Sequence, residues 1–176
     1  YNILKNRGLN NIHYLGFHYD INENIKIHKI NLKKVIVANT AVHILHLSGL
    51  NGLFRKRTDI IIKIFKNLYK KGLKFKLNIV IQGNFKLKDY TILQEPFINV
   101  IKDHLSYSEI LNLYNKNHFS IQLSKQEGLG LGFYESCFMG TPVITLNAPP
   151  HNEIIQHDNN GYLLSCYTKK DEKPEN

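Results

Sequence analysis

The chain has 176 residues, of which 43% are hydrophobic and 21% charged, without repeats or low-complexity tracts. This composition excludes a disordered or fibrous protein and is typical of one globular domain with a buried core. The formal net charge of +9 favours an anionic partner, such as a nucleotide, a nucleic acid or an acidic surface. No run of about 18 apolar residues is present, so we expect no transmembrane segment.

From residue 41 onward, buried strands alternate with amphipathic helices. Thr58 is expected to cap one helix, with an apolar stripe that includes Ile60, Ile61 and Ile64. Ser106 and Glu109 form a capping box that opens another helix. We expect strands over residues 41–47, 75–81, 97–101, 119–123, 142–146 and 161–165, and helices over residues 58–71, 106–115, 133–139 and 152–157.

The expected strands are continuous apolar runs rather than alternating patterns. Such runs predict a parallel sheet covered by helices on both faces, which is a Rossmann-like, doubly wound α/β fold. Ligands of such folds bind outside the carboxyl ends of the strands. The loops at that edge therefore hold the residues of functional interest.

The most informative segment is SKQEGLGLGFYESCFMGTPVITL, residues 124–146. Gly128, Gly130 and Gly132 are expected between the end of a strand and the start of a helix. Backbone N–H groups there are unpaired and carry the positive end of the helix dipole, which suits a phosphate. Carboxylates would repel a phosphate, so Glu127 and Glu135 more plausibly hold hydroxyl groups of a sugar or ribose.

The pattern Ser124-x-x-Glu127-Gly-x-Gly, followed by Glu135 and Gly140-Thr-Pro-Val-Ile, resembles the EX7E signature of retaining GT-B glycosyltransferases. The closest match is the glycosyltransferase group 1 (GT4-like) family. Further segments resemble the same family in the same order: AVHILHLSG with RKRTDIIIKIF, NIVIQG, DHLSYSEILNLY and HNEIIQHDNNGYLL. The resemblance covers about residues 41–166.

The resemblance implies the donor-binding, carboxyl-terminal half of a GT-B enzyme. Such an enzyme moves a sugar from a UDP- or GDP-sugar to an acceptor with retention, a hexosyltransferase-type reaction. Glu127 would face the donor sugar, Lys56 would stabilise the leaving diphosphate, and Glu135 would bind the ribose hydroxyls. The other donor-binding candidates are Gly49, Arg55, Arg57, Gly83, Ser124, Gly128, Leu129 and Gly130; for Ser124, a hydroxyl that stabilises the loop is an equal alternative.

The sequence lacks a metal-binding motif and one arginine that is usual in the family. No Asp-x-Asp motif occurs, so we expect no metal and no cofactor besides the nucleotide-sugar. One position departs from the family, because Leu50 stands where an arginine is usual. The acceptor, a glycan, protein or lipid, would bind through an amino-terminal domain that this sequence does not include, so we expect the isolated fragment to be inactive.

The remaining segments set the expected domain limits and compartment. Residues 1–40, with candidate strands at 12–17 and 25–30, are expected to be a linker or opening β-unit of a preceding domain. The nucleotide-sugar domain is expected over residues 41–168, and a frayed or truncated tail over residues 169–176. Two cysteines, Cys137 and Cys166, make neither a disulfide framework nor a zinc site, so a reducing, cytoplasmic location is expected, with a membrane-peripheral one as the alternative.

Other interpretations stay open at this point. A non-catalytic module that binds nucleotide or nucleic acid fits the charge, although basic and aromatic residues are not interleaved, so nucleic acid is not expected. A GT-B epimerase or phosphorylase is a third interpretation. His43 and His46 face opposite sides of a strand and cannot share a metal. The segment with His151 and Asn152 is either a structural turn or a donor contact.

Overall fold

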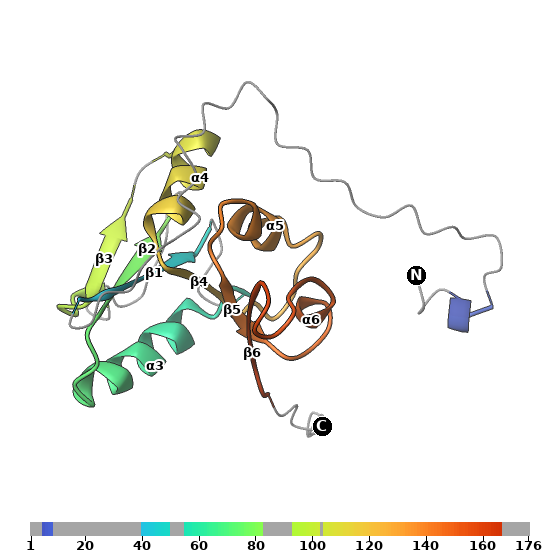
Figure 1. The fold of residues 1–176 in the computed structure, drawn as a ribbon, viewed down its shortest axis with the longest axis horizontal. Helices are drawn as coiled ribbons and strands as arrows, with labels where there is room; N and C mark the ends of the chain where they lie inside the picture. The colour runs from blue at the N-terminus through green and yellow to red at the C-terminus, as the bar shows by residue number, and fades with distance from the viewer. Residues whose placement is uncertain (1–4, 9–39, 50–54, 83–92, 103, 167–176) are drawn as a thin grey trace, which may run out of the picture.

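The protein is described by a computed structural model that covers residues 5–8, 40–49, 55–82, 93–102 and 104–166 (Figure 1). These residues form a six-stranded parallel sheet with four helices around it. The strands are β1 (Val42–Leu47), β2 (Phe75–Val80), β3 (Ile98–Ile101), β4 (Phe119–Gln122), β5 (Val143–Leu146) and β6 (Gly161–Leu164). The helices are α3 (Thr58–Lys70), α4 (Tyr107–Lys116), α5 (Leu131–Phe138) and α6 (His151–Ile154).

The strand order is β3-β2-β1-β4-β5-β6, with every neighbouring pair parallel. The chain winds outward from β1 through β2 to β3, returns to the centre at β4, and then winds the other way. This order confirms the doubly wound Rossmann-like fold that the sequence predicts. Between β1 and β4 lies the point where the winding direction reverses, and ligands of such sheets bind there, outside the carboxyl ends of the strands.

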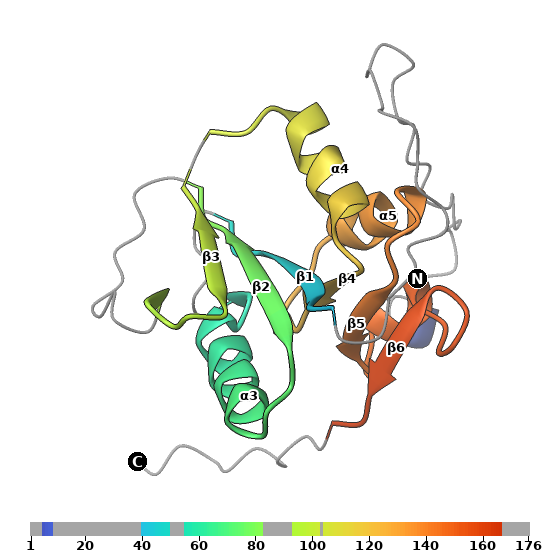
Figure 2. The same cartoon turned by 60° about the vertical axis from the view of Figure 1, so that its left-hand side comes forward.

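Helices cover both faces of the sheet. Ile61 and Phe65 of α3 pack with Ile44 of β1 in one core cluster, whereas Leu111 of α4 packs with Leu45 in another. Successive residues of a strand point to opposite faces, so α3 and α4 lie on opposite sides (Figures 1 and 2). The α5 helix contacts α4 and lies on the same side.

The helix α3 differs from the expectation in two details. Thr58 is its first residue rather than its cap; Arg57 occupies the cap position in a left-handed conformation, without a side-chain hydrogen bond to the helix. The expected apolar stripe is also wrong in part, because Ile60 and Ile64 are each 39% exposed and Ile62 is buried instead. Apolar residues of α3 lie on more than one side of the helix, so their periodicity alone does not identify the buried side.

The other helices confirm the expected elements with shifted bounds. The capping box of α4 is present, with Ser106 and Glu109 each bonded to the other's backbone. The α5 helix begins at Leu131, two residues before the expected start, so Gly132 lies inside its first turn and not in the preceding loop. The α6 helix spans four residues, shorter than the expected 152–157.

Several expectations concern residues outside the described part of the chain. The candidate strands at 12–17 and 25–30, the tail at 169–176, and Gly83 and Leu50 all lie there. The expected domain limits therefore stay predictions. Cys137 and Cys166 are both free thiols.

Candidate functional site

The loops that follow β1 and β4 are joined at the carboxyl edge of the sheet. The backbone N–H of Lys125 donates to the carbonyl of Arg55 at 2.9 Å. The Arg55 guanidinium donates in return to the carbonyl of Gln126 at 3.3 Å. These loops flank the switch point of the sheet, so the sequence-predicted basic group, residues 55–57, lies beside the loop that carries Glu127.

Lys56 and Glu127 form a partly buried ion pair although 71 residues separate them. The Lys56 Nζ lies 2.5 Å from Oε1 of Glu127, and the two side chains are 17% and 8% exposed. Arg55 lies further off, with Nη1 at 3.7 Å from Oε2. Burial alone would raise the pKa of Glu127, but Lys56, the adjacent Ser124 hydroxyl and Arg55 outweigh burial and lower that pKa. Glu127 is therefore ionised at neutral pH.

A left-handed glycine starts α5, directly after this loop. Gly130 has φ +67°, and a Cβ there would lie 2.7 Å from Cδ2 of Phe133. A side chain at that position would therefore face both strain and a clash. Leu129 is 58% exposed and Gly128 is exposed, with open space around it. Gly128 and Leu129 are thus exposed just before the amino end of a helix, where N–H groups attract anions, whereas Gly130 itself is buried.

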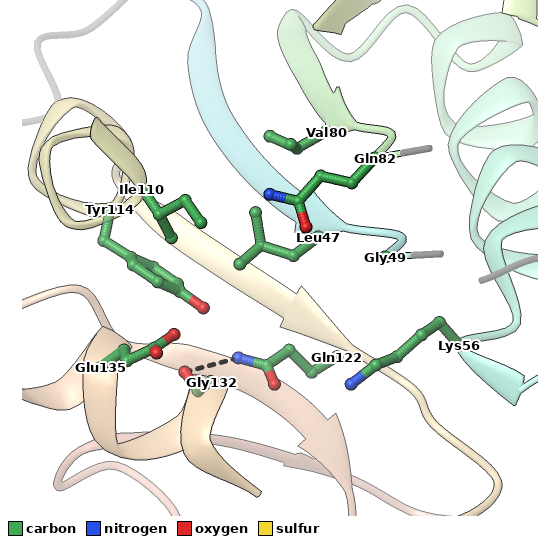
Figure 3. A pocket seen from close by; sticks show the side chains of 10 residues that line it. All are labelled: Leu47, Gly49, Lys56, Val80, Gln82, Ile110, Tyr114, Gln122, Gly132 and Glu135. Carbon is green, nitrogen blue, oxygen red and sulfur yellow. Dashed lines mark hydrogen bonds between the residues drawn. The ribbon is translucent and has the colours of Figure 1, made fainter. Parts of the chain in front are cut away.

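A cavity of about 190 Å³ opens between this helix, α4 and the ends of β1, β2 and β4. Figure 3 shows Glu135 and Tyr114 on one side of the cavity, Lys56 on the other and Gln122 between them. The Gln122 amide donates to the carbonyl of Gly132 at 2.9 Å. The full lining is Leu47, Gly49, Lys56, Val80, Gln82, Ile110, Tyr114, Gln122, Gly132 and Glu135.

Glu135 is the acidic group of this cavity. Burial raises the pKa of its carboxyl, while a hydrogen bond with Tyr114 and the charge of Lys56 act in the opposite direction and only partly offset it. Burial and Glu135 also raise the pKa of Tyr114 well above its usual value, so the phenol stays protonated. A carboxylate facing a neutral hydroxyl and an apolar wall is suited to accept hydrogen bonds from ligand hydroxyl groups.

His151 joins the same neighbourhood from the loop after β5. It is 3% exposed, and its ring lies 5.3 Å from the ring of Phe133. Burial lowers its pKa; Glu127 raises it, and Lys56 and Arg57 lower it further. Among the described residues, neither His151 Nδ1 nor Arg57 Nε has a hydrogen-bond partner. His151 therefore lies among the charged residues of the site, and its role, a structural turn or a donor contact, stays a prediction.

The structure brings most of the expected site residues together. Gly49, Lys56 and Glu135 line one cavity, and Glu127 lies beside it on Lys56. Asn152 is exposed and bonded to Asn147, so it does not join the site. The sequence reasoning missed the cavity residues Tyr114, Gln122 and Gln82. Gln122 is the last residue of β4 and Gln82 follows β2, so both lie at the carboxyl ends of strands, and this position was the available signal; Tyr114 lies on α4 and carries no such signal.

Within the described ranges, no cluster of three or more His, Cys, Asp or Glu side chains is arranged to hold a metal ion. His43 and His46 do not meet, since His43 bonds His118 and is exposed whereas His46 is buried. In the same part of the chain, no helix has both the length and the apolar character needed to cross a membrane.

Comparison with known proteins identifies the family. Residues 47–173 match the family model described as glycosyl transferases group 1. The protein named glycosyltransferase 48 of Sulfolobus islandicus filamentous virus (isolate Iceland/Hveragerdi) is 33% identical over 79 residues, which are 45% of this chain and 26% of that protein. The chain thus spans about a quarter of the viral relative.

Solved structures share the fold. TarM superimposes with a TM-score of 0.60 at 23% identity, covering 79% of this chain and 28% of that one. The pneumococcal O-GlcNAc transferase GtfA, solved with UDP and GlcNAc, gives 0.54 at 20% identity, covering 74% and 26%. The C-terminal domain of the group 1 protein LpcC from Francisella tularensis gives 0.56 at 21% identity, covering 72% and 69%. The chain therefore belongs to the glycosyl transferases group 1 family and has the Rossmann-like fold of the C-terminal domain of GT-B glycosyltransferases.

Proposed function

We propose that this chain binds the nucleotide-sugar donor of a retaining glycosyltransferase and carries the donor half of its active site. The observation that carries the proposal is the cavity at the switch point of the sheet, where Lys56 and Glu135 face one space at the start of α5. A cation and a carboxylate in one cavity, at the amino end of a helix, fit the diphosphate and the hydroxyl groups of one ligand. The GT-B relative solved with UDP supports a uridine nucleotide, and GDP is the alternative.

In the proposed complex, Glu135 accepts hydrogen bonds from the ribose hydroxyls. Glu135 follows Gly132 by three residues on α5, and its carboxylate lies opposite the apolar side chains of Leu47 and Val80. Those apolar groups suit the flat faces of a nucleobase, whereas a carboxylate beside a phosphate would repel it. The diphosphate therefore belongs at the other end of the cavity, near Lys56 and the turn at Gly130.

Lys56 supplies the charge that the reaction needs. When the bond between the anomeric carbon and the diphosphate breaks, the diphosphate takes the electron pair, and a nearby ammonium stabilises that developing charge. The acceptor hydroxyl bonds to the same face of the carbon and gives its proton to the departing phosphate oxygen. Because Lys56 and backbone N–H groups serve the diphosphate, we propose a metal-independent reaction.

Glu127 faces the donor sugar in this proposal. It is ionised, held by Lys56, and follows the strand next to the switch point. An ionised carboxylate at that place can accept hydrogen bonds from sugar hydroxyls and stabilise positive charge on the reacting carbon. The acceptor, whether glycan, protein or lipid, would bind through a second domain, so the chain alone should bind donor without transferring sugar.

The test is a calorimetric titration of UDP and of GDP into the wild-type chain and into Glu135→Ala. One of the nucleotides should bind the wild type, and the variant should lose at least tenfold in affinity, because charged hydrogen bonds contribute about 1.5–3 kcal/mol. Glu153→Ala is the matched control, since Glu153 is an exposed carboxylate of α6 outside the cavity, and it should bind like the wild type. Equal affinity in Glu135→Ala and wild type would overturn the ribose assignment.

A further inference from the structure

A buried chain of hydrogen bonds runs beneath the Lys56 turn. His46 of β1 is 1% exposed, and its Nδ1 lies 3.0 Å from the carbonyl oxygen of Ile121 on β4. Its Nε2 lies 2.8 Å from the Thr58 hydroxyl, which in turn lies 3.0 Å from the Ser48 hydroxyl. All three side chains are buried at the junction of β1, β4 and α3.

The carbonyl of Ile121, at one end of this hydrogen-bond network, determines which group donates in each of the other hydrogen bonds. A carbonyl only accepts, so Nδ1 of His46 carries the hydrogen and Nε2 is the acceptor. Thr58 therefore donates to Nε2, and its oxygen accepts from Ser48. Burial lowers the pKa of His46 to about 4, so the ring is neutral at neutral pH, which agrees with this arrangement.

The hydroxyl of Thr58 is directed to His46 instead of capping its own helix. Arg57, just before it, has φ 53° and ψ 37°, a left-handed conformation that costs a non-glycine residue about 1–2 kcal/mol. Such a conformation persists when its surroundings hold it. Before Lys56, the carbonyl of Arg55 accepts a hydrogen bond from the Lys125 N–H. After Lys56, the Thr58 hydroxyl donates to His46. Lys56 lies between these two attachments.

We propose that His46 and Thr58 are positioning residues that fix the Lys56 ammonium against Glu127 and, in the proposed enzyme, against the donor diphosphate. The second part of this inference rests on the proposed function; the first does not. The hydrogen-bond chain joins the two central strands to the turn, and so Lys56 is placed by the sheet rather than by its own flexible side chain. The network acts through Lys56 and has no contact with substrate of its own.

The first measurement needs no ligand. The titration of the Glu127 carboxyl is followed by carbon-detected NMR in wild type, Thr58→Val, Thr58→Ser and Thr141→Val. Thr58→Val keeps the shape and removes the hydroxyl, so Lys56 should move and the pKa of Glu127 should rise; Thr58→Ser should keep the wild-type value. Thr141→Val is the matched control, because Thr141 is also fully buried and its hydroxyl donates at 2.6 Å to the backbone carbonyl of Tyr114, but it lies just before β5, at the amino ends of the strands and away from Lys56.

The second measurement is a double-mutant cycle on the affinity for UDP, or for GDP if GDP is the nucleotide that binds the wild type. Thr58→Val should weaken nucleotide binding about tenfold in the wild-type background and not at all in Lys56→Met, since coupled residues show interaction energies that independent ones lack. Thr58→Ser should restore affinity. A pKa of Glu127 that is the same in Thr58→Val and Thr141→Val, or equal losses of nucleotide affinity with and without Lys56, would overturn the inference. If the carboxyl titration shifts as expected and no nucleotide binds the wild type, the positioning holds and the proposed function fails.

Discussion

The Lys56–Glu127 pair gives the sharpest prediction about the energetics of the site. Replacing Lys56 by Met removes the cation and leaves the Glu127 carboxylate, 8% exposed, without its 2.5 Å partner. Breaking a buried pair by removing one partner costs about 3–5 kcal/mol. Lys56 keeps 17% exposure, and Arg55 and the Ser124 hydroxyl remain nearby, so we expect a loss of about 2 kcal/mol.

The assay is urea unfolding of wild type, Lys56→Met, Glu127→Gln and the double variant at pH 7. The double variant should be no less stable than Lys56→Met, because removing the carboxylate also removes the uncompensated charge. The interaction energy from this cycle should be about 1.5–2 kcal/mol. Single effects that add to within about 0.5 kcal/mol would refute the reasoning that the two groups stabilise one another.

The pH dependence of the same variant provides a second check. In the wild type the pKa of Glu127 lies below its ordinary value of 4.5, so its contribution to stability is present above that value and is lost as pH falls through the folded pKa. In Lys56→Met, burial should raise this pKa above the ordinary value. A protonated carboxyl needs no cation, so the deficit of Lys56→Met should begin to shrink as pH falls through the raised pKa of the variant, above 4.5, and should continue to shrink until pH passes the lowered pKa of the wild type.

Two further predictions concern single residues. Burial lowers the pKa of His46 from 6.5 to about 4, so the neutral ring contributes fully to the free energy of unfolding above pH 6.5, and this contribution is lost as pH falls towards 4. Urea unfolding should therefore show the free energy of unfolding declining by up to about 3 kcal/mol over this range, and His46→Gln should lack this decline. Gly130→Ala should lower the free energy of unfolding by about 1–3 kcal/mol, because of the positive φ and the clash with Phe133. Gly128→Ala should leave it nearly unchanged, and urea unfolding of both variants checks this difference. Equal effects at the two glycines would contradict the steric argument.

Local signals in the sequence were reliable where the interactions themselves are local. The capping box of Ser106 and Glu109 lies within four residues, and the structure has it as predicted. The buried strands were equally clear, because a parallel sheet covered on both faces requires continuous apolar runs. The doubly wound fold follows from the alternation of these runs with amphipathic helices.

Long-range contacts explain what the sequence could not predict. Thr58 has the residue type of a helix cap, but its hydroxyl bonds His46, twelve positions earlier, which is a contact that only the folded sheet creates. The buried side of α3 was ambiguous because isoleucines occupy neighbouring positions all around it. The Lys56–Glu127 pair spans 71 residues and depends on the placement of β1 beside β4.

The candidate site was likewise predictable only in part. The resemblance to the family pointed to Glu127, Lys56 and Glu135, and the structure places these three at one end of the sheet. The cavity wall made by Tyr114 and Gln122 carries no short motif, because it is created by the packing of α4 against β1 and α5. Their roles towards a nucleotide-sugar remain predictions.

The central claim is that one nucleotide occupies the cavity with its ribose on Glu135 and its phosphates on Lys56. A crystal structure of the chain with UDP or GDP, at a concentration that saturates the calorimetric isotherm, tests it most directly. The account predicts ribose oxygens within about 3.2 Å of the Glu135 carboxylate and phosphate oxygens within reach of Lys56 Nζ and the backbone at Gly130. A nucleotide bound elsewhere, or bound here with its phosphates beside Glu135, would contradict it.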